Sequence, residues 1–193
     1  MLSGGMDSVA LAWGLRPDLS ITIDYGQLPA EGEIQAAAAV CLSLGLSHRV
    51  IRVDCRSLGS GDMAGTIAIP AAPVSEWWPF RNQLLITFGA AAALQAGLSS
   101  LVIGAVSSDA SHVDGRSEFF EAMSRVLHLQ EGSMGLETPA LVETTVSLCQ
   151  RLSVPFEVLA WSHSCHVSDR ACGQCRGCCK HRESMRALGY GEY

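Results

Sequence analysis

Two glycines, two hydroxyl side chains and a carboxylate lie together near the start of the chain. The segment Ser3-Gly4-Gly5-Met6-Asp7-Ser8 can turn sharply because glycine has no Cβ, and such a turn directs several backbone N–H groups toward one anion. A helix expected to begin near Asp7 would point its positive end at the same place. A carboxylate repels bare phosphate, so Asp7 makes chemical sense where Mg²⁺ lies between the two. The segment therefore predicts a loop that binds a nucleotide together with a metal ion.

Four cysteines near the other end of the chain have the spacing of a metal site. They are Cys165, Cys172, Cys175 and Cys178. Two residues between neighbouring cysteines place both sulfurs on one turn, and four thiolates can surround a tetrahedral Zn²⁺. In a chain expected to be cytosolic, this clustering favours metal binding over disulfides. With all four positions filled by protein, the predicted zinc site is closed and structural, not hydrolytic.

Alternative ligands surround these four cysteines in the sequence. Cys179 is left over, because adjacent cysteines rarely bind the same ion. His163, His166 and His181 are nearby donors, and one of them could replace a sulfur. An iron–sulfur cluster on the same cysteines is a weaker alternative.

Composition limits the class of protein. The chain has 193 residues, of which 48% are hydrophobic and 17% charged, enough for one buried core. Its net charge of −6 argues against broad binding to nucleic acids or membrane surfaces. No uninterrupted apolar run reaches the roughly 18 residues that a membrane span needs. A phosphate loop that starts at residue 3 leaves no room for a signal peptide, so a cytoplasmic location is expected.

Strands and helices that could position these residues alternate along the chain. Apolar and β-branched runs predict strands over residues 20–25, 49–53 and 101–106, and helical periodicity predicts helices over 8–15, 31–44 and 81–95. This alternation indicates an α/β fold, Rossmann-like, with parallel strands and helices on both faces of the sheet. Ligands of such sheets lie at the carboxyl ends of the strands. The phosphate loop, residues 25–27 and residues 107–116 are therefore expected to converge on one cleft.

The rest of the chain gives weaker signals. Only two residues precede Ser3, so the strand expected before such a loop is rudimentary or lies partly outside the sequence. Residues 55–76 read as a long functional or mobile loop. Two helical stretches follow Ser117, and residues 156–161 look strand-like. We expect a nucleotide-binding domain over residues 1–160 and, over 161–193, a four-cysteine zinc module with a terminal helix packed on it.

The first motif resembles the signature of the PP-loop ATP pyrophosphatases, enzymes that cleave ATP between the α- and β-phosphates and adenylate an oxygen of their substrate. Read alone, it could also be a glycine-rich turn before a helix. With Tyr25-Gly26-Gln27 and the cysteine segment, it resembles the 7-cyano-7-deazaguanine synthase (QueC) family. The residues 79–82, 114–119 and 137–139, together with Arg182, resemble further segments of that family in the same order. The similarity extends over essentially the whole chain.

That resemblance implies a reaction. ATP would adenylate the carboxylate of 7-carboxy-7-deazaguanine, ammonia would displace AMP to give an amide, and a second ATP-driven step would dehydrate the amide to a nitrile. A carboxylate does not react with amines until it carries a leaving group, so the sequence of steps is chemically sound. The resemblance implies ATP as co-substrate, with Mg²⁺ and Zn²⁺ as metals. A zinc knuckle beside an apolar helix would also suit a homodimer.

The same resemblance assigns candidate roles. The candidate ATP-binding residues are Ser3, Gly4, Gly5, Asp7, Ser8, Tyr25, Gln27 and Arg81. The candidate substrate-binding residues are Asp114, Arg116 and Trp78, and the candidate catalytic residues are Asp7, Arg81, Asp114 and Arg116. Arg81 could hold pyrophosphate, Asp114 could accept hydrogen bonds from a guanine-like ring, and Arg116 could pair with a phosphate or carboxylate. The alternatives are a surface charge for Arg81, a solvated loop pair for Asp114 and Arg116, and core packing for Trp78.

Two departures from the family pattern leave other functions open. Residues 109–116 are shorter than the family segment and lack its aromatic residue and its cysteine, and Thr145 stands where the family has a lysine. The activated base could instead be passed to a protein amine, as in homologues from bacterial antiviral defence. Another PP-loop reaction such as tRNA thiolation is disfavoured by the acidic charge. A non-catalytic module that binds a nucleotide or a partner is the remaining alternative.

Overall fold

The computed structural model describes residues 1–191 and divides the chain into two compact units. The larger unit joins Leu2–Pro79 to Thr145–Tyr193, and the smaller contains Met1 and Phe80–Thr144. Each unit is built around its own pair of parallel strands. The α/β class with parallel strands, predicted from the alternation of elements, is confirmed.

In the larger unit, β1 (Ser20–Asp24) pairs in parallel with β2 (His48–Arg52), with Ser20 opposite His48. Ile21 and Ile23 of β1 are buried, as expected for a β-branched strand inside a core. The connection between the two strands is α2 (Ala30–Leu44), which packs on both and ends at Gly45 in the left-handed conformation. The unit thus has the β-α-β arrangement that a parallel pair requires.

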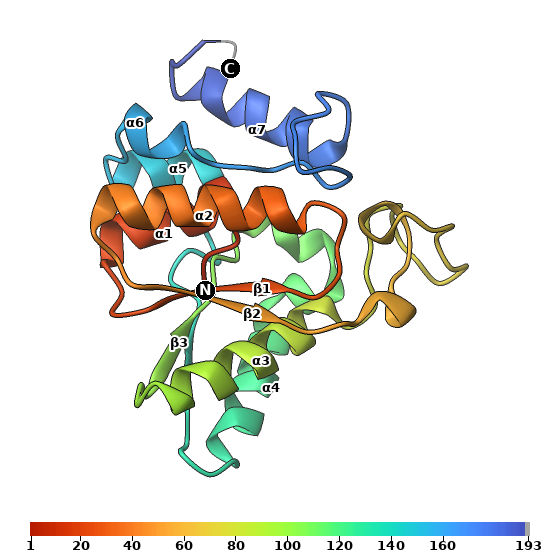
Figure 1. The fold of residues 1–193 in the computed structure, drawn as a ribbon, viewed down its shortest axis with the longest axis vertical. Helices are drawn as coiled ribbons and strands as arrows, with labels where there is room; N and C mark the ends of the chain where they lie inside the picture. Colours follow the sequence, from red (N-terminus) through yellow and green to blue (C-terminus); the bar gives the residue numbers. More distant parts are fainter. Residues whose placement is uncertain (192–193) are drawn as a thin grey trace. The chain divides into compact units, whose positions relative to one another are not determined.

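Four further helices complete the larger unit (Figure 1). They are α1 (Met6–Leu15), α5 (Thr145–Arg151), α6 (Phe156–Leu159) and α7 (Arg176–Ala187). Helix α1 contacts α2, α5 and α6, and its Val9 and Ala10 are fully buried. Helix α7 follows the cysteine segment and contacts α5. The N-terminal and C-terminal segments of the chain therefore share one core.

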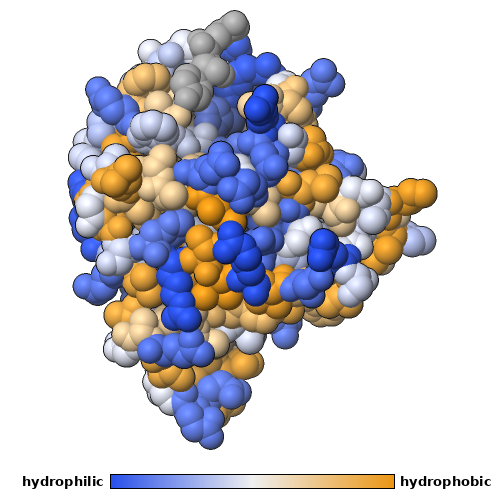
Figure 2. All heavy atoms as spheres, viewed as in Figure 1, coloured by the Kyte–Doolittle hydropathy of each residue, from blue (hydrophilic) through white to orange (hydrophobic). Residues whose placement is uncertain are grey.

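A long loop follows β2, as predicted, and carries two short 3-10 turns, η1 (Arg56–Leu58) and η2 (Asp62–Ala64). Met63 and Trp78 anchor the loop in the core, with 3% and 1% of their surfaces exposed. Ile67, in contrast, is 94% exposed. Apolar atoms gather at the tip of this loop at the right edge of Figure 2.

The smaller unit is organised around β3 (Ser100–Val102) and β4 (Gly135–Glu137), which pair in parallel with Leu101 opposite Leu136. Helix α3 (Arg81–Gln95) packs on β3, and α4 (Ser117–His128) packs on β4. Between β3 and α4, the chain forms two 3-10 turns, η3 (Ser107–Ser111) and η4 (Val113–Gly115). These turns carry the segment that includes Asp114.

Two expectations from the sequence concern residues 156–161 and the short segment that precedes the phosphate loop. The prediction that residues 156–161 are strand-like is wrong, because Pro155 precedes a short helix, α6, in which Ala160 N donates to Phe156 O over 2.8 Å. No strand is assigned over residues 1–5, yet Leu2 N donates to Ile21 O over 2.8 Å and attaches the loop to β1. Among residues 1–191, no helix combines the length and the apolar character needed to cross a bilayer.

Candidate nucleotide loop and cysteine centre

The loop over residues 3–8 has a backbone that only glycine fits at its second position. Gly4 has φ +80°, and a Cβ there would lie 2.8 Å from Glu33 O and 2.9 Å from Ala36 Cβ of α2. Gly5 is the N-cap of α1, and within the described part of the chain no side chain caps that helix. The first N–H groups of α1 therefore carry the positive end of the helix into this loop.

The two serines of the loop have different surroundings. Ser8 is buried, and its Oγ accepts from Ser3 N over 3.2 Å and donates to Gly5 O over 2.9 Å. Ser3 is exposed, and its Oγ accepts a 3.4 Å hydrogen bond from Gly5 N. Ser8 thus holds the loop in shape, whereas Ser3 presents its hydroxyl at the surface.

Asp7 lies in the first turn of α1 and faces α5 and α7. Its Oδ2 is 3.5 Å from Lys180 Nζ on α7, and its side chain is 20% exposed. Burial, followed by the charge of Asp7, raises the pKa of Cys149 on α5 to about 12. The phosphate loop is therefore bordered by the helix that leads out of the cysteine segment.

Tyr25, Gln27 and Trp78 occupy the region beyond the end of β1. The rings of Tyr25 and Trp78 meet edge to face with centroids 4.9 Å apart, and both side chains are buried. Gln27 is also buried; its amide accepts from Tyr25 N over 2.9 Å and donates to Glu33 Oε2 over 2.8 Å. All three side chains shape the turn after β1. Their contacts with ATP or substrate stay predictions.

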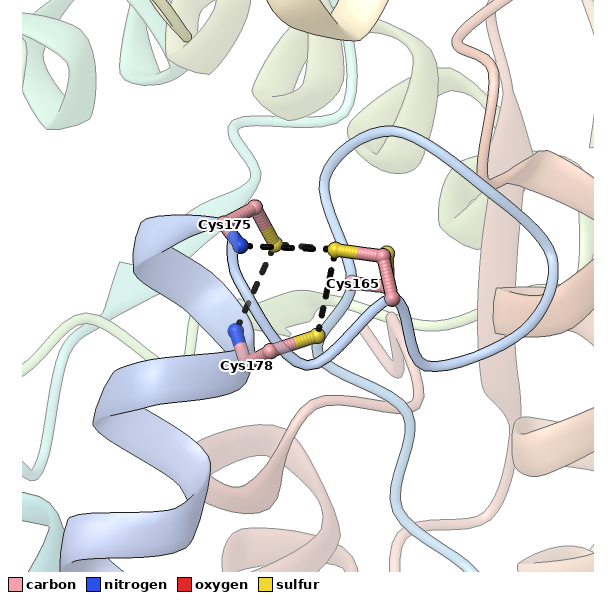
Figure 3. Close-up of side chains that lie close together, drawn as sticks. Cys165, Cys175 and Cys178 are labelled. Atoms are coloured by element: carbon pink, nitrogen blue, oxygen red, sulfur yellow. Dashed lines mark hydrogen bonds between the residues drawn. The ribbon is translucent and has the colours of Figure 1, made fainter.

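The structure brings the sulfurs of Cys165, Cys172, Cys175 and Cys178 within 4.8 Å of one another. Cys165 comes from the segment before α7, Cys175 is the N-cap of α7, and Cys178 lies in its first turn; Figure 3 shows these three side chains directed at one point. The Cys172–Cys178 and Cys165–Cys175 sulfur pairs are each 3.9 Å apart. These four side chains could hold a metal.

Backbone N–H groups surround the same sulfurs. Hydrogen bonds from Gln174 N and Cys175 N lower the pKa of Cys172 to about 6, whereas burial raises the pKa of Cys178 to about 12. His166 N donates to Cys175 Sγ over 3.4 Å. Four crowded thiols do not all ionise without a cation between them, so metal binding here would release protons. Cys179 lies outside the cluster, and its Sγ donates to Gln174 O.

The segment that carries Cys165 also touches the phosphate loop. His163 N donates to Gly4 O over 2.8 Å, and Gly32 N at the start of α2 donates to Asp169 Oδ1 over 3.2 Å. A Cβ on Gly32 would lie 2.7 Å from Asp169 O, so glycine is needed for this approach. The cysteine segment therefore forms one wall of the loop region.

Arg81, Asp114 and Arg116 belong to the smaller unit. Asp114 belongs to η4 and lies beside the start of α3. Its Oδ2 accepts from Asn82 N over 3.4 Å, and its backbone carbonyl accepts from Asn82 Nδ2 over 2.8 Å. Arg116 Nε donates to Ala110 O over 3.1 Å. Arg81 is the first residue of α3, next to Asn82. The structure thus groups Arg81 and Asp114 at one helix start, and their convergence with the phosphate loop stays a prediction.

Thr145 lies in the larger unit as the first residue of α5. It is 5% exposed, and its Oγ1 is buried with no hydrogen-bond partner among residues 1–191. It lies one turn before Cys149, whose pKa is raised by burial and, to a smaller extent, by the charge of Asp7. Thr145 therefore places a small buried hydroxyl at the position where the resemblance described above implies a lysine.

Comparison with known proteins identifies the family. A model of the queuosine biosynthesis protein QueC matches residues 1–189. The chain belongs to the QueC family. The 7-cyano-7-deazaguanine synthase of Desulforudis audaxviator is 32% identical over 98% of this chain and 96% of its own length, and that of Thermoplasma volcanium is 29% identical over 100% and 87%. The membership predicted from the ordered motifs is confirmed.

A solved structure shows the fold relationship. The U34-tRNA thiolase NcsA from Methanococcus maripaludis, with its [4Fe-4S] cluster, aligns with 99% of this chain and 71% of its own length. The TM-score is 0.51 and the sequence identity 17%, so the likeness concerns the fold. As a QueC family protein with this loop, the chain is a QueC-like PP-loop enzyme.

Sequence reasoning missed two residues of this region. The motifs point to no role for Lys180, yet its ammonium lies 3.5 Å from Asp7 Oδ2 at the phosphate loop. His163 was considered as a metal donor, whereas its backbone supports Gly4. That Lys180 is the only lysine of the chain could have drawn attention to it.

Proposed function

We propose that this QueC family enzyme uses ATP to adenylate the carboxylate of 7-carboxy-7-deazaguanine or a similar deazapurine acid. The observation that carries the proposal is the loop at the start of α1, where Gly4 adopts φ +80° and Asp7 occupies the first turn. Backbone N–H groups at a helix N-terminus suit the phosphates of a nucleotide. The relatives named 7-cyano-7-deazaguanine synthase support the choice of substrate.

The chain's own residues would act mainly by binding and orienting. The loop N–H groups and the Ser3 hydroxyl would hold the phosphates, and Asp7 would hold Mg²⁺, which offsets their charge. Pyrophosphate gains charge as it leaves the α-phosphorus, so donors aimed at it favour the transition state. Arg81 is the candidate for that role from the smaller unit, and Asp114 and Arg116 are the candidates for substrate binding.

Ammonia as the acceptor gives the amide and, after a second ATP-driven dehydration, 7-cyano-7-deazaguanine. The short segment at residues 109–116 and Thr145, which stands where the resemblance implies a lysine, support a substrate pocket whose lining differs from that of the family. Transfer of the activated base to a protein amine is therefore the alternative product. We also propose a homodimer and a cytoplasmic location.

The cysteine centre suits one zinc ion. Zinc–sulfur bonds of about 2.3 Å place tetrahedral ligands about 3.8 Å apart. The Cys172–Cys178 and Cys165–Cys175 sulfur pairs are each 3.9 Å apart, and all four sulfurs lie within 4.8 Å of one another. A [4Fe-4S] cluster puts four irons between its ligands and needs them farther apart. A zinc ion here would be structural, since no ligand position is left for substrate.

Adenylation is tested by following one carboxylate oxygen of the substrate into AMP. The purified chain is incubated with ATP, Mg²⁺, ammonium and 7-carboxy-7-deazaguanine labelled with oxygen-18 in its carboxylate. We expect substrate-dependent release of pyrophosphate and transfer of one labelled oxygen to AMP. Label in phosphate would show phosphorylation instead, and a pyrophosphate rate unaffected by substrate would contradict the proposal. Asp7→Asn is the matched control and should release little pyrophosphate.

Mass spectrometry of the products then identifies the acceptor. Nitrile or amide that appears only with ammonium supports ammonia. A mass gain on a protein present in the reaction, with no small-molecule product, supports the conjugation alternative. Binding of ATP with neither product nor pyrophosphate would support the non-catalytic alternative.

A further inference from the structure

The one lysine of this chain lies at the phosphate loop. Lys180 is on α7, two residues after Cys178, and its Nζ is 3.5 Å from Asp7 Oδ2. The two residues are far apart in sequence and meet because α7 folds back toward α1. Its side chain is 40% exposed, so a ligand can reach it from solvent.

The neighbouring cations of the same segment are directed elsewhere. Arg176 pairs with Glu76 of the long loop over 2.7 Å. Arg182 donates to Gly173 O over 3.1 Å and to Cys179 Sγ over 3.7 Å. Among these three cations, Lys180 is the one directed at the loop that carries Ser3 and Gly4.

We propose that Lys180 is a phosphate-binding residue of this enzyme, held on Asp7 until ATP and Mg²⁺ arrive. Mg²⁺ would then take over the charge of Asp7, and the ammonium would turn to the β- and γ-phosphates. A lysine suits this exchange, because its ammonium is a compact charge with three donors on a flexible four-carbon chain. The inference rests on the proposed function for the identity of the nucleotide.

The placement also bears on the chemical step. Pyrophosphate gains negative charge as it leaves, and an ammonium that α7 holds beside the loop can stabilise this charge after a rotation of its side chain. Lys180 would act on the leaving group by charge, with no bond to it formed or broken. Cys175 is the N-cap of the helix that carries Lys180, so the cysteine centre sets the position of a group that would touch the nucleotide.

A single lysine permits a direct test of binding. Brief acylation with acetic anhydride, followed by peptide mass mapping, reports the reactivity of Lys180 separately from the α-amino group. We expect ATP with Mg²⁺, and pyrophosphate with Mg²⁺, to slow acylation of Lys180, and adenosine to leave it unchanged. Acylation unaffected by saturating ATP, or slowed equally by adenosine, would overturn the proposal.

Substitutions test the same contact independently. Lys180→Met should raise the Kd for ATP with Mg²⁺ by about tenfold to a hundredfold, the range for a lost hydrogen bond to a charged group. Lys180→Arg should restore most of the affinity, and neither variant should change the affinity for adenosine. Arg186→Met, which removes a charge from the last turn of the same helix, should bind ATP like the parent.

Metal content and thermal unfolding of each variant exclude damage to the cysteine centre. If Lys180→Met keeps its metal and binds ATP as tightly as the parent, the proposal is wrong. The proposed function can fail separately. A parent protein that shows protection of Lys180 by ATP but no substrate-dependent pyrophosphate would refute adenylation and support the lysine contact. Substrate-dependent pyrophosphate release with the same kinetics in the parent and in Lys180→Met would support adenylation and refute the lysine contact.

Discussion

Arg176 Nη1 lies 2.7 Å from Glu76 Oε1, and this ion pair joins the cysteine segment to the long loop after β2. Arg176 stands between Cys175 and Cys178, and Glu76 stands two residues before the buried Trp78. Only 11% of the Glu76 side chain is exposed. Burial opposes its ionisation, but the hydrogen bond from Arg176 and nearby positive charge outweigh burial and lower the pKa of Glu76. The end of the long loop is therefore held by the cysteine centre.

Removing this ion pair should release the loop. Arg176→Met leaves a mostly buried carboxylate without its partner, and we expect a loss of about 1–2 kcal/mol of stability. Thermolysin should then cleave residues 55–79 faster. Arg56→Met is the control, because its partner Asp54 in the same loop is exposed and the pair should contribute little. Equal cleavage rates in both variants would count against the anchoring role.

The cysteine centre should bind metal through four residues and not five. Cys175→Ser should abolish stoichiometric zinc, lower the Tm and mimic the loop release seen with Arg176→Met. Cys179→Ser should retain zinc, because its sulfur lies outside the cluster. Zinc content by mass spectrometry and thermal unfolding are the measurements. Zinc lost equally from both variants would show that the ligand set is misassigned.

Gly4 should tolerate alanine far less well than Gly45. Both have positive φ, and alanine in that region costs about 1–2 kcal/mol. A Cβ on Gly4 would also meet Glu33 O and Ala36 Cβ, whereas no atom of the described residues lies within 4 Å of a Cβ on Gly45. Gly4→Ala should therefore lose more stability in urea and bind ATP weakly, and Gly45→Ala should keep ATP binding. Similar losses in the two variants would contradict the predicted loop geometry.

His48 should make stability fall in mild acid. Thr22 Oγ1 donates to Leu2 O, so His48 Nε2 donates to Thr22 Oγ1 over 2.8 Å. Burial lowers the pKa of His48 below 6.5, so the unfolded chain binds the proton first as pH falls. Stability is then lost below about pH 6.5, until the pH passes the pKa in the folded protein.

Urea unfolding at pH 7 and pH 5.5 measures this effect. His48→Gln keeps a hydrogen-bond donor and cannot titrate. The free energy of unfolding of this variant should therefore fall less between these pH values than that of the parent, by up to about 1 kcal/mol, and by less for a partly exposed ring. An identical pH dependence in parent and variant would exclude a contribution from His48. Nitrogen-15 NMR should show the Nε2–H tautomer at neutral pH.

Thr145 should tolerate valine. Valine has the same shape and removes a buried hydroxyl that has no partner among residues 1–191, so stability should change by less than about 1 kcal/mol, in the stabilising direction. Thr145→Ser keeps the hydroxyl, removes a buried methyl group and should destabilise by about 1 kcal/mol. If Thr145→Val instead weakens ATP binding, the hydroxyl contacts the nucleotide.

Local patterns predicted the parts of this protein that depend on neighbouring residues. The bounds of α3 match the predicted helix over residues 81–95, and the strand over residues 20–25 differs from β1 by one residue. The spacing of the four cysteines predicted which sulfurs would meet. Turn and helix geometry over a few residues determines such contacts, so spacing alone carries the information.

Sequence patterns failed where a contact joins distant parts of the chain, or where a neighbouring residue favours a different secondary structure. Residues 156–161 are apolar enough for a strand, but Pro155 favours the start of a helix, and no strand within residues 1–191 pairs with them. The role of Gln27 in ATP binding stays a prediction, but the hydrogen bonds of its amide with Tyr25 N and Ile23 O were not predicted from the sequence. The ion pair of Lys180 with Asp7 depends on how α7 packs, which no spacing encodes.

The hydrogen bond from His163 N to Gly4 O links the segment that carries the cysteines to the phosphate loop, so damage to the cysteines would also affect the loop. Cys172 is the exposed member of the four-cysteine cluster, which makes it the sulfur most accessible to oxidants. An oxidant that coupled Cys172 to a neighbouring sulfur would expel the ion and loosen the segment that supports Gly4. Oxidative stress would then appear as a loss of nucleotide affinity.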